Sequence, residues 1–288
     1  MEELDLPRPG FIIPEKIGPW AIDSVIYSDR DKVRIVSTTN PNWIIKIFIG
    51  DKACIDEISN ILMMKRQGVS YSVQTPNDAY HQFGTGPGYA WFAMRKYTGH
   101  ITNDSLFKLH WRKIATSVLY FLRDLHLNCG HVYMDIKTTN ILYLQSSTHP
   151  PDFVVADYEL VDTIEINRPT RSFSNNTKWY YIAMGAELDE PLYSWRMDLV
   201  ALGYTLASIT HNYEERPMWK YYNQCLARRE NRLSLSITDN SIIALRSVEI
   251  ADEDPIILEY LRVVSEFPWN SPTPPSADFY TRLMSIFQ

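Results

Sequence analysis

The chain has 288 residues, of which 45% are hydrophobic, so it is long enough to bury a full core as one large domain or as two lobes. Its formal net charge of −6 argues against a dedicated nucleic-acid-binding protein, which would normally have a basic face, and we expect no direct contact with nucleic acid. Cys54, Cys129 and Cys225 are far apart, which indicates a reducing compartment without disulfides or a cysteine-based zinc site. No apolar run approaches the ~20 residues of a membrane span, and the acidic, Pro-rich start is unlike a signal peptide. We therefore expect an intracellular, cytoplasmic protein with no membrane partner.

The first third of the chain has the pattern of an antiparallel sheet with one helix. Apolar and β-branched residues predict strands at 21–28, 32–38 and 43–49. Residues 51–67 carry apolar side chains at near-helical spacing and are followed by Gly68, which predicts a helix that ends there. Residues 79–97 predict two further strands joined by a Gly-Pro-Gly turn.

Beyond Gly99 the pattern changes from strands to helices. Residues 105–128 predict a long amphipathic helix, and residues 255–267 predict another. Residues 197–210 are almost wholly apolar, which predicts a helix buried within a helical mass. The sequence therefore predicts an α+β chain, with a small sheet and one helix followed by a larger helical region that contains two short strands.

The stretch HVYMDIKTTNILYL, residues 131–144, contains an Asp, a Lys and an Asn in the order D-x-K-x-x-N. Transfer of a phosphoryl group needs cations that hold the phosphates and a carboxylate near the attacking hydroxyl. In that chemistry Asp135 would accept the hydroxyl proton, Lys137 would offer a charge to the γ-phosphate, and Asn140 would place its amide oxygen on a metal ion. Asp157 follows an apolar run, and the residues between are enough for a β-hairpin that returns its carboxylate beside Asn140, as Mg²⁺ would require. A solvated turn is the alternative interpretation of an isolated D-x-K-x-x-N, so the choice depends on the rest of the chain.

A lysine inside the apolar strand WIIKIFI is the second unusual feature. The ammonium group of Lys46 is costly to bury unless it finds a partner. Glu57 lies on the following predicted helix, and a Lys–Glu pair that bridges strand and helix beside the α/β-phosphates is what a kinase active site requires. The alternatives are a lysine that reaches solvent, a solvated glutamate, or pairing through the adjacent Asp56.

With these residues in place, the chain resembles a eukaryotic-type protein kinase, and within that fold the vaccinia-related kinase family, a branch close to casein kinase 1. The resemblance runs from about residue 12 to the end. YMDIKTTNIL is similar to the family's H-G-D-I-K-x-x-N-[IL]-[LV], ADYELV to its D-Y-G-L, and NNTKWYYIAM…YSWRMDLVALGY to N-G-T-x-E-F-T…S-R-R-G-D-L-E-x-L-G-Y. The resemblance implies a bilobal fold, with an N-terminal extension at 1–14, a β-rich N-lobe at 15–97 and an α-helical C-lobe at 98–288, together one protein kinase domain.

The same resemblance implies an activity, the transfer of the ATP γ-phosphate to Ser or Thr hydroxyls of a protein substrate, with ATP and Mg²⁺ as cofactors. It assigns catalysis to Asp135 and Lys137, and the metal to Asn140 and Asp157. Contacts with ATP are assigned to Gly18, Val25, Lys46, Glu57, Met94, Lys96 and Tyr97. Thr177 would help to dock the substrate, and Asp198 would anchor the backbone of the catalytic loop from the buried helix.

Three places depart from the family's pattern. The Gly-rich loop keeps only Gly18, while Trp20 and Asp23 stand where bare backbone would cover the phosphates. Glu159 replaces the Gly of D-Y-G, and Tyr133–Met134 replace His–Gly. Two functions therefore stay open: an active Ser/Thr kinase, and a pseudokinase that binds a partner protein and holds nucleotide weakly or not at all.

Overall fold

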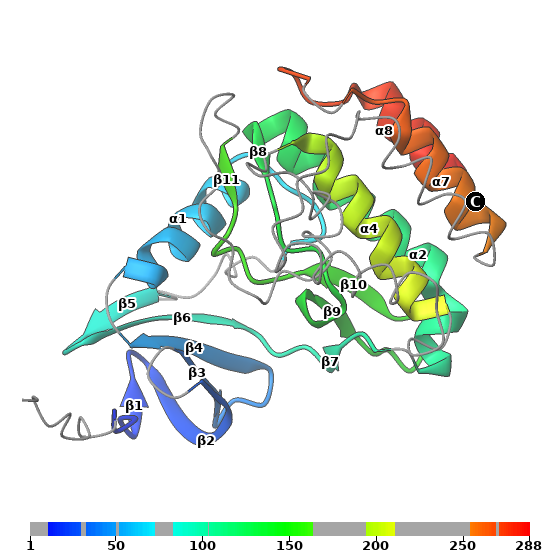
Figure 1. Ribbon diagram of the computed structural model, residues 1–288. Helices are drawn as coiled ribbons and strands as arrows, with labels where there is room; N and C mark the ends of the chain where they lie inside the picture. The colour runs from blue at the N-terminus through cyan, green and yellow to red at the C-terminus, as the bar shows by residue number, and fades with distance from the viewer. Residues whose placement is uncertain are drawn as a thin grey trace, which may run out of the picture. The chain divides into compact units, whose positions relative to one another are not determined.

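The computed structural model describes residues 11–29, 33–49, 52–72, 83–102, 104–163, 194–210, 254–268 and 271–288 (Figure 1). Over these residues the chain is mixed α and β, with a curled antiparallel sheet and five α-helices. The chain divides into two compact units. The first comprises Met1–Leu62 and Val73–Lys96, and the second comprises Met63–Ser72 and Tyr97–Gln288.

The first unit is built on a six-stranded sheet with the order β1-β2-β3-β4-β6-β5, in which every described pair of neighbours is antiparallel. The strands are β1 (Lys16–Ile17), β2 (Trp20–Asp29), β3 (Val33–Thr38), β4 (Trp43–Ile49), β5 (Phe83–Gly86) and β6 (Tyr89–Arg95). The strands predicted at 21–28, 32–38 and 43–49 are confirmed as β2, β3 and β4. The predicted hairpin around the Gly-Pro-Gly turn is confirmed as β5 and β6.

One face of this sheet encloses an apolar core. Because side chains alternate between the two faces of a strand, alternate residues of β3, β4 and β6 reach this core. Its buried members are Ile17, Val36, Ile45, Ile47, Tyr89, Trp91 and Ala93, with Phe11, Ile13, Trp20 and Ile22 packed against them. The intervening residues of β4, among them Lys46, therefore point to the opposite face.

The helix α1 (Lys52–Arg66) follows β4 and ends two residues before Gly68, whose φ of +67° is in the left-handed region that glycine tolerates. Residues Met63–Ser72, which include the last turn of α1, belong to the second unit. Hydrogen bonds tie the end of this segment to other residues of that unit. The backbone N–H of Ser70 donates to Asp124 at 2.9 Å, and Val155 donates to the carbonyl of Tyr71 at 2.8 Å.

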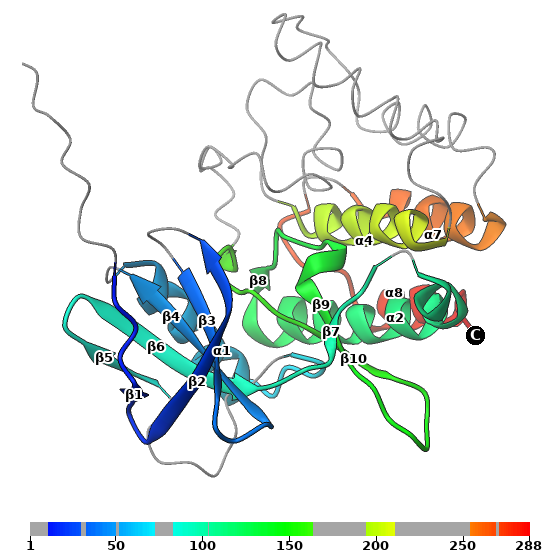
Figure 2. The same ribbon diagram turned by 90° about the horizontal axis from the view of Figure 1, so that it is seen from below.

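The described helices of the second unit are α2 (Ser105–Asp124), α4 (Trp195–Thr210), α7 (Pro255–Ser265) and α8 (Ala277–Ser285), and they pack side by side (Figure 2). Helix α4 is buried on all sides over most of its length, as its apolar sequence predicts. The helix predicted at 105–128 ends earlier as α2. Its last turn widens into a π-helix at Leu125–Cys129, closed by Gly130 in the left-handed region. No helix among the described residues is both long and apolar enough to cross a membrane.

The described part of the second unit also contains five short strands, and two of its loops connect them. They are β7 (Gly99–His100), β8 (His131–Val132), β9 (Ile141–Leu144), β10 (Asp152–Val155) and β11 (Asp162–Thr163). The predicted hairpin is confirmed, because β9 and β10 are antiparallel and Ile141 lies opposite Val155. β8 pairs with β11 in the same way. One loop leads from β8 to β9 and the other from β10 to β11, so the paired strands bring the ends of the two loops together. These loops contain the residues that the sequence assigned to catalysis and to the metal, which are Asp135, Lys137, Asn140 and Asp157.

Candidate active site

Lys46 and Glu57 form an ion pair within the first unit. Lys46 Nζ lies 2.7 Å from Glu57 Oε2, and the Glu57 side chain is 2% exposed. The ammonium also lies 5.1 Å from the centre of the Phe48 ring, which attracts a cation through its electron-rich face. The predicted strand-to-helix pair is therefore present, and the contact of Lys46 with phosphates stays a proposal.

The segment that the resemblance compares with a Gly-rich loop is a tight hairpin between β1 and β2. Ile17 pairs with Trp20, so only Gly18 and Pro19 form the turn. Gly18 has a φ of +56°, and a Cβ added there would lie 2.6 Å from the Trp91 ring. The backbone conformation and the close packing on Trp91 therefore both require glycine at position 18. These two requirements hold whether or not Gly18 contacts a nucleotide.

Asp23 is held against the sheet by two serines. Its Oδ2 accepts hydrogen bonds from Ser37 Oγ at 3.0 Å and from Ser24 Oγ at 3.2 Å, and the two hydroxyls lie 2.7 Å apart. The register of β2 against β3 is irregular here, which brings both serines to the same carboxylate. The carboxylate that the sequence placed in the Gly-rich loop is therefore tied to β3.

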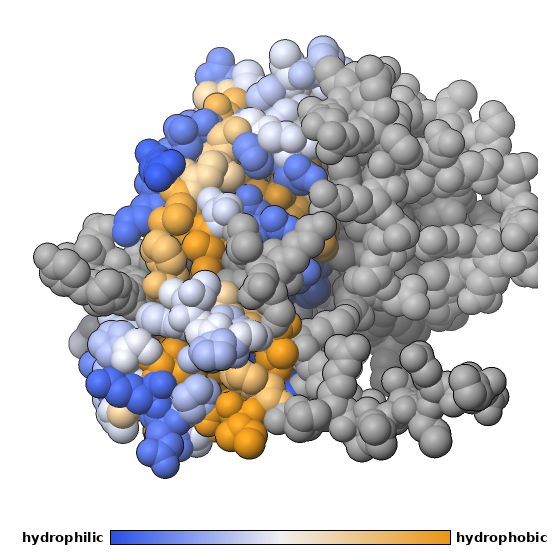
Figure 3. Space-filling model, turned by 90° about the vertical axis from the view of Figure 1, so that its left-hand side faces the viewer, coloured by the Kyte–Doolittle hydropathy of each residue, from blue (hydrophilic) through white to orange (hydrophobic). Residues whose placement is uncertain are grey.

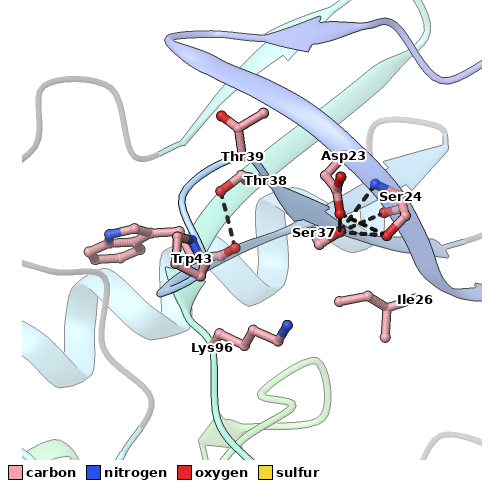
Figure 4. A pocket seen from close by; sticks show the side chains of 9 residues that line it. Asp23, Ser24, Ile26, Ser37, Thr38, Thr39, Trp43 and Lys96 are labelled. Atoms are coloured by element: carbon pink, nitrogen blue, oxygen red, sulfur yellow. Dashed lines mark hydrogen bonds between the residues drawn. The ribbon is translucent and has the colours of Figure 1, made fainter.

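These residues line a pocket of about 320 Å³ within the first unit. Figure 4 shows Asp23, Ser24 and Ser37 together on one side, with the Lys96 side chain extending toward Ile26. Lys96 is exposed, and its backbone N–H donates to Asn42 at 2.8 Å. The pocket therefore offers one ammonium group and a hydroxyl-bound carboxylate to a polar ligand.

Three other predicted ATP contacts occupy different environments. Met94 is buried on β6, opposite Ile44 of β4. Val25 lies on β2 between two register irregularities and is half exposed, as are the next two residues. Tyr97 belongs to the second unit. Hydrophobic residues reach the surface among hydrophilic ones on the face drawn in Figure 3. Exposed apolar side chains are common on protein surfaces, so the half-exposed Val25 does not by itself indicate a binding site.

In the second unit, Asp198 anchors the loop between β8 and β9. Its carboxylate, fully buried on α4, accepts the backbone N–H of Tyr133 at 2.7 Å and that of Met134 at 2.8 Å. His126 Nε2 lies 3.0 Å from the same carboxylate, and the Tyr280 hydroxyl pairs with His126 Nδ1. The arrangement agrees with the anchoring role that the resemblance implies for Asp198. His126 therefore belongs to the same buried hydrogen-bonded network as Asp198.

Asp135 lies at the centre of the loop with one carboxylate oxygen engaged. Its Oδ2 accepts from Lys137 Nζ at 2.8 Å and from Asn140 Nδ2 at 2.7 Å. Its Oδ1 is buried and has no hydrogen-bond partner among the described residues. Burial raises the pKa of the carboxyl from 3.8 to about 6, against the opposing effect of the Lys137 ammonium. Asp135 therefore has one buried acceptor oxygen without a described partner, and its pKa is about 6.

Asn140 and Asp157 lie on the two loops that meet beside Asp135. Asn140 Nδ2 also donates to the Asp135 carbonyl at 3.1 Å, and the Ala156 N–H donates to the Asn140 carbonyl at 2.8 Å. Asp157 follows at once with a φ of +66°, a conformation that a non-glycine residue adopts at a cost. The negative charge of Asp157 is among the causes that raise the pKa of Asp135, which indicates that the two carboxylates are neighbours.

The sequence did not reveal the role of Tyr133. This phenol is fully buried and joins the two loops through its hydroxyl group, which contacts Ala156 and Asn140. Its only sequence signal was its departure from the family's His. Thr177, assigned to substrate docking, lies outside the described residues.

No model of a known protein family matches this sequence, and no curated protein is significantly similar to it. The functional interpretation therefore depends on the geometry of these residues and on the motifs that contain them.

Proposed function

We propose that this chain is a Ser/Thr protein kinase that transfers the γ-phosphate of ATP to protein hydroxyls, with the bilobal fold of the vaccinia-related kinases. The observation that carries the proposal is the buried, unsatisfied Oδ1 of Asp135, held beside Lys137 and Asn140 in a loop anchored by Asp198. A buried polar atom without a partner is costly, and such atoms gather where a reaction or a ligand uses them.

The donor set fits Mg²⁺ and ATP. Asn140 directs its NH₂ group to Asp135, which leaves its Oδ1 to act as a metal ligand beside the Asp157 carboxylate. Among the described residues no three His, Cys, Asp or Glu side chains gather to hold a metal ion by themselves. This is compatible with Mg²⁺, which proteins usually hold with one or two carboxylates together with substrate phosphates.

Each residue then has one task. Mg²⁺-bound ATP, when present, supplies the phosphoryl group and a positive charge that offsets its oxygens. Asp135 accepts the proton of the substrate hydroxyl through Oδ1. At the same time the hydroxyl oxygen bonds to the γ-phosphorus, and the bond between that phosphorus and the departing ADP oxygen breaks. Lys137 donates to the transferred group, and Lys46, oriented by Glu57, donates to the α/β-phosphates. Thr177 is assigned to substrate docking by the resemblance alone.

A binding module without catalysis is the second candidate function. It is favoured by the two-residue turn at Gly18–Pro19, because this turn packs on Trp91 and provides no run of bare backbone for phosphates. The carboxylate of Asp23 and the exposed Glu159 add negative charge at positions where the family has glycine. In this case the chain acts by docking a partner protein.

The decisive experiment compares the parent protein with Asp135→Asn, purified identically and free of contaminating kinases. Phosphate transfer from ATP to a pool of Ser/Thr peptides and the thermal shift caused by Mg²⁺ and ATP are both measured. We expect transfer by the parent alone and equal thermal shifts, because Asp135 acts on the hydroxyl and not on the nucleotide. The control is Asp152→Asn, which changes an exposed carboxylate paired with Lys113.

Equal transfer by parent and Asp135→Asn would remove Asp135 from its role. Nucleotide binding without transfer would favour the binding module. If the parent does not bind ATP, a variant with glycine at 20, 23 and 159 tests whether these side chains exclude it. Absence of binding by both proteins would reject the kinase proposal.

A further inference from the structure

The hydroxyl group of Tyr133 bridges the two loops that carry Asn140 and Asp157. It donates a hydrogen bond to the carbonyl of Ala156, the residue before Asp157, and accepts one from Asn140 Nδ2 at 3.2 Å. A hydroxyl can do both because it has one donor and two acceptor sites on a single oxygen. No aliphatic or phenylalanine side chain could join a carbonyl to an amide in this way.

The ring of Tyr133 is fixed by packing. It meets the Phe121 ring edge-on at 5.4 Å and the Tyr158 ring at 6.3 Å, and it is fully buried. Its backbone N–H is held by Asp198 at 2.7 Å. Phe121 of α2 and Asp198 of α4, which lie outside the two loops, therefore help to set the position of the hydroxyl.

The hydrogen bonds of its Nδ2 atom fix the orientation of the Asn140 side-chain amide. Nδ2 faces three acceptors, the Tyr133 hydroxyl and both the carbonyl and the Oδ2 of Asp135. Among the described residues Oδ1 is contacted only by the Thr139 hydroxyl, at a long 3.5 Å. A flipped amide would set its oxygen against two oxygen acceptors of Asp135, so the observed orientation presents Oδ1 outward.

We propose that Tyr133 is a positioning residue that fixes the Asn140 amide and the backbone before Asp157 in the arrangement that binds Mg²⁺. This inference rests on the proposed function, because it assigns the metal to those two residues. Groups that hold metal ligands in place commonly contribute 10–100-fold to metal affinity. Loss of the hydroxyl should leave the ring packing intact and loosen the two ligands relative to each other.

The chain provides a matched control in Tyr158. This phenol is also buried, packs on the same Phe121 ring, and donates to the carbonyl of Val155, one residue before Ala156. No hydrogen bond joins it to Asn140 among the described contacts. Tyr133→Phe and Tyr158→Phe therefore remove the same atom from neighbouring sites, and only the first breaks a hydrogen bond to Asn140.

The test measures binding without turnover. Mn²⁺, detected by electron paramagnetic resonance, is titrated into parent, Tyr133→Phe and Tyr158→Phe in the presence of ADP, and ATP affinity is measured with and without Mg²⁺. We expect Tyr133→Phe to need roughly 10–100-fold more metal, with unchanged metal-free nucleotide affinity, and Tyr158→Phe to match the parent. Binding by Tyr133→Phe should recover at high Mg²⁺, which a merely unfolded protein would not show.

Equal metal dependence in the parent and Tyr133→Phe, or an equal loss in both variants, would overturn this inference and leave the kinase proposal intact. A loss in Tyr133→Phe that high Mg²⁺ does not recover would also overturn it. A parent that binds neither metal nor nucleotide would instead reject the proposed function, and the inference with it.

Discussion

The carboxylate of Asp198 holds the backbone N–H of Met134 at 2.8 Å, at a residue whose φ of +67° lies in the left-handed region. A non-glycine residue adopts that region at a cost of roughly 1–2 kcal/mol. The hydrogen bond that Met134 donates to this fully buried carboxylate offsets the cost and sets the direction in which the chain enters Asp135. Helix α4 therefore controls the geometry of the loop, although it contributes no group to the proposed reaction.

Asp198→Asn tests that control. The amide replaces one acceptor oxygen by an NH₂ donor that faces backbone N–H groups, so we expect the free energy of unfolding to fall by about 2–4 kcal/mol. Urea unfolding measures this change. Asp152→Asn serves as the control, since its exposed pair with Lys113 contributes at most about 1 kcal/mol. Equal stabilities of the two variants would show that the anchor contributes little.

Lys46→Met should leave Glu57 buried without its cation. Removing one partner of a buried pair is costly, so we expect a loss of about 3 kcal/mol in the free energy of unfolding. The double variant Lys46→Met/Glu57→Leu should recover most of this loss and yet show no thermal shift with ATP. Recovery of both stability and ATP binding would remove Lys46 from the nucleotide site.

The pKa of Asp135 predicts how stability depends on pH. In the folded protein burial raises this pKa to about 6, so the folded state binds more protons than the unfolded state between about pH 4 and pH 6. The free energy of unfolding should then fall as the pH rises through this window, by roughly 3 kcal/mol from this group. Asp135→Asn should flatten this decline in urea titrations, and an unchanged slope would contradict the shifted pKa.

The same titration sets the activity of the proposed kinase. Only the ionised carboxylate of Asp135 can accept the hydroxyl proton, so the transfer rate should rise as the pH increases through about 6. The ratio kcat/KM measured from pH 5 to pH 8 checks this expectation, because it reports the pKa values of the free enzyme. A rate that decreases over this range would exclude Asp135 as the base.

Gly18→Ala and Gly88→Ala separate backbone conformation from packing. Both glycines have positive φ, +56° and +75°, but an added Cβ would meet the Trp91 ring at Gly18 and nothing within 4 Å at Gly88. We expect a loss of about 1 kcal/mol at Gly88 and about 2–4 kcal/mol at Gly18. Equal losses in thermal or urea unfolding would mean that the hairpin shifts away from Trp91 without cost.

Local patterns in the sequence determined much of this protein. Alternation of apolar residues predicted β2, β3 and β4, and the wholly apolar run at 197–210 predicted the buried helix α4. The short spacing of Asp135, Lys137 and Asn140 made their contact in one loop foreseeable, because five residues of chain cannot separate them far. The burial of a lysine in a strand required a partner, and this requirement pointed to Glu57 on the helix that follows.

Only the tertiary structure decided which distant groups complete the site. Asp198 reaches Met134 from 64 positions along the chain, and Tyr280 reaches His126 from 154 positions. The bridge from Tyr133 to Ala156, and the packing of Gly18 against Trp91, likewise join residues that no periodic pattern relates. Periodicity specifies the face on which a side chain lies, but a hydrogen bond or a ring contact depends on distances of a few ångströms between separate elements. Those distances are set by how the whole core packs, and this is why the sequence alone could not identify these partners.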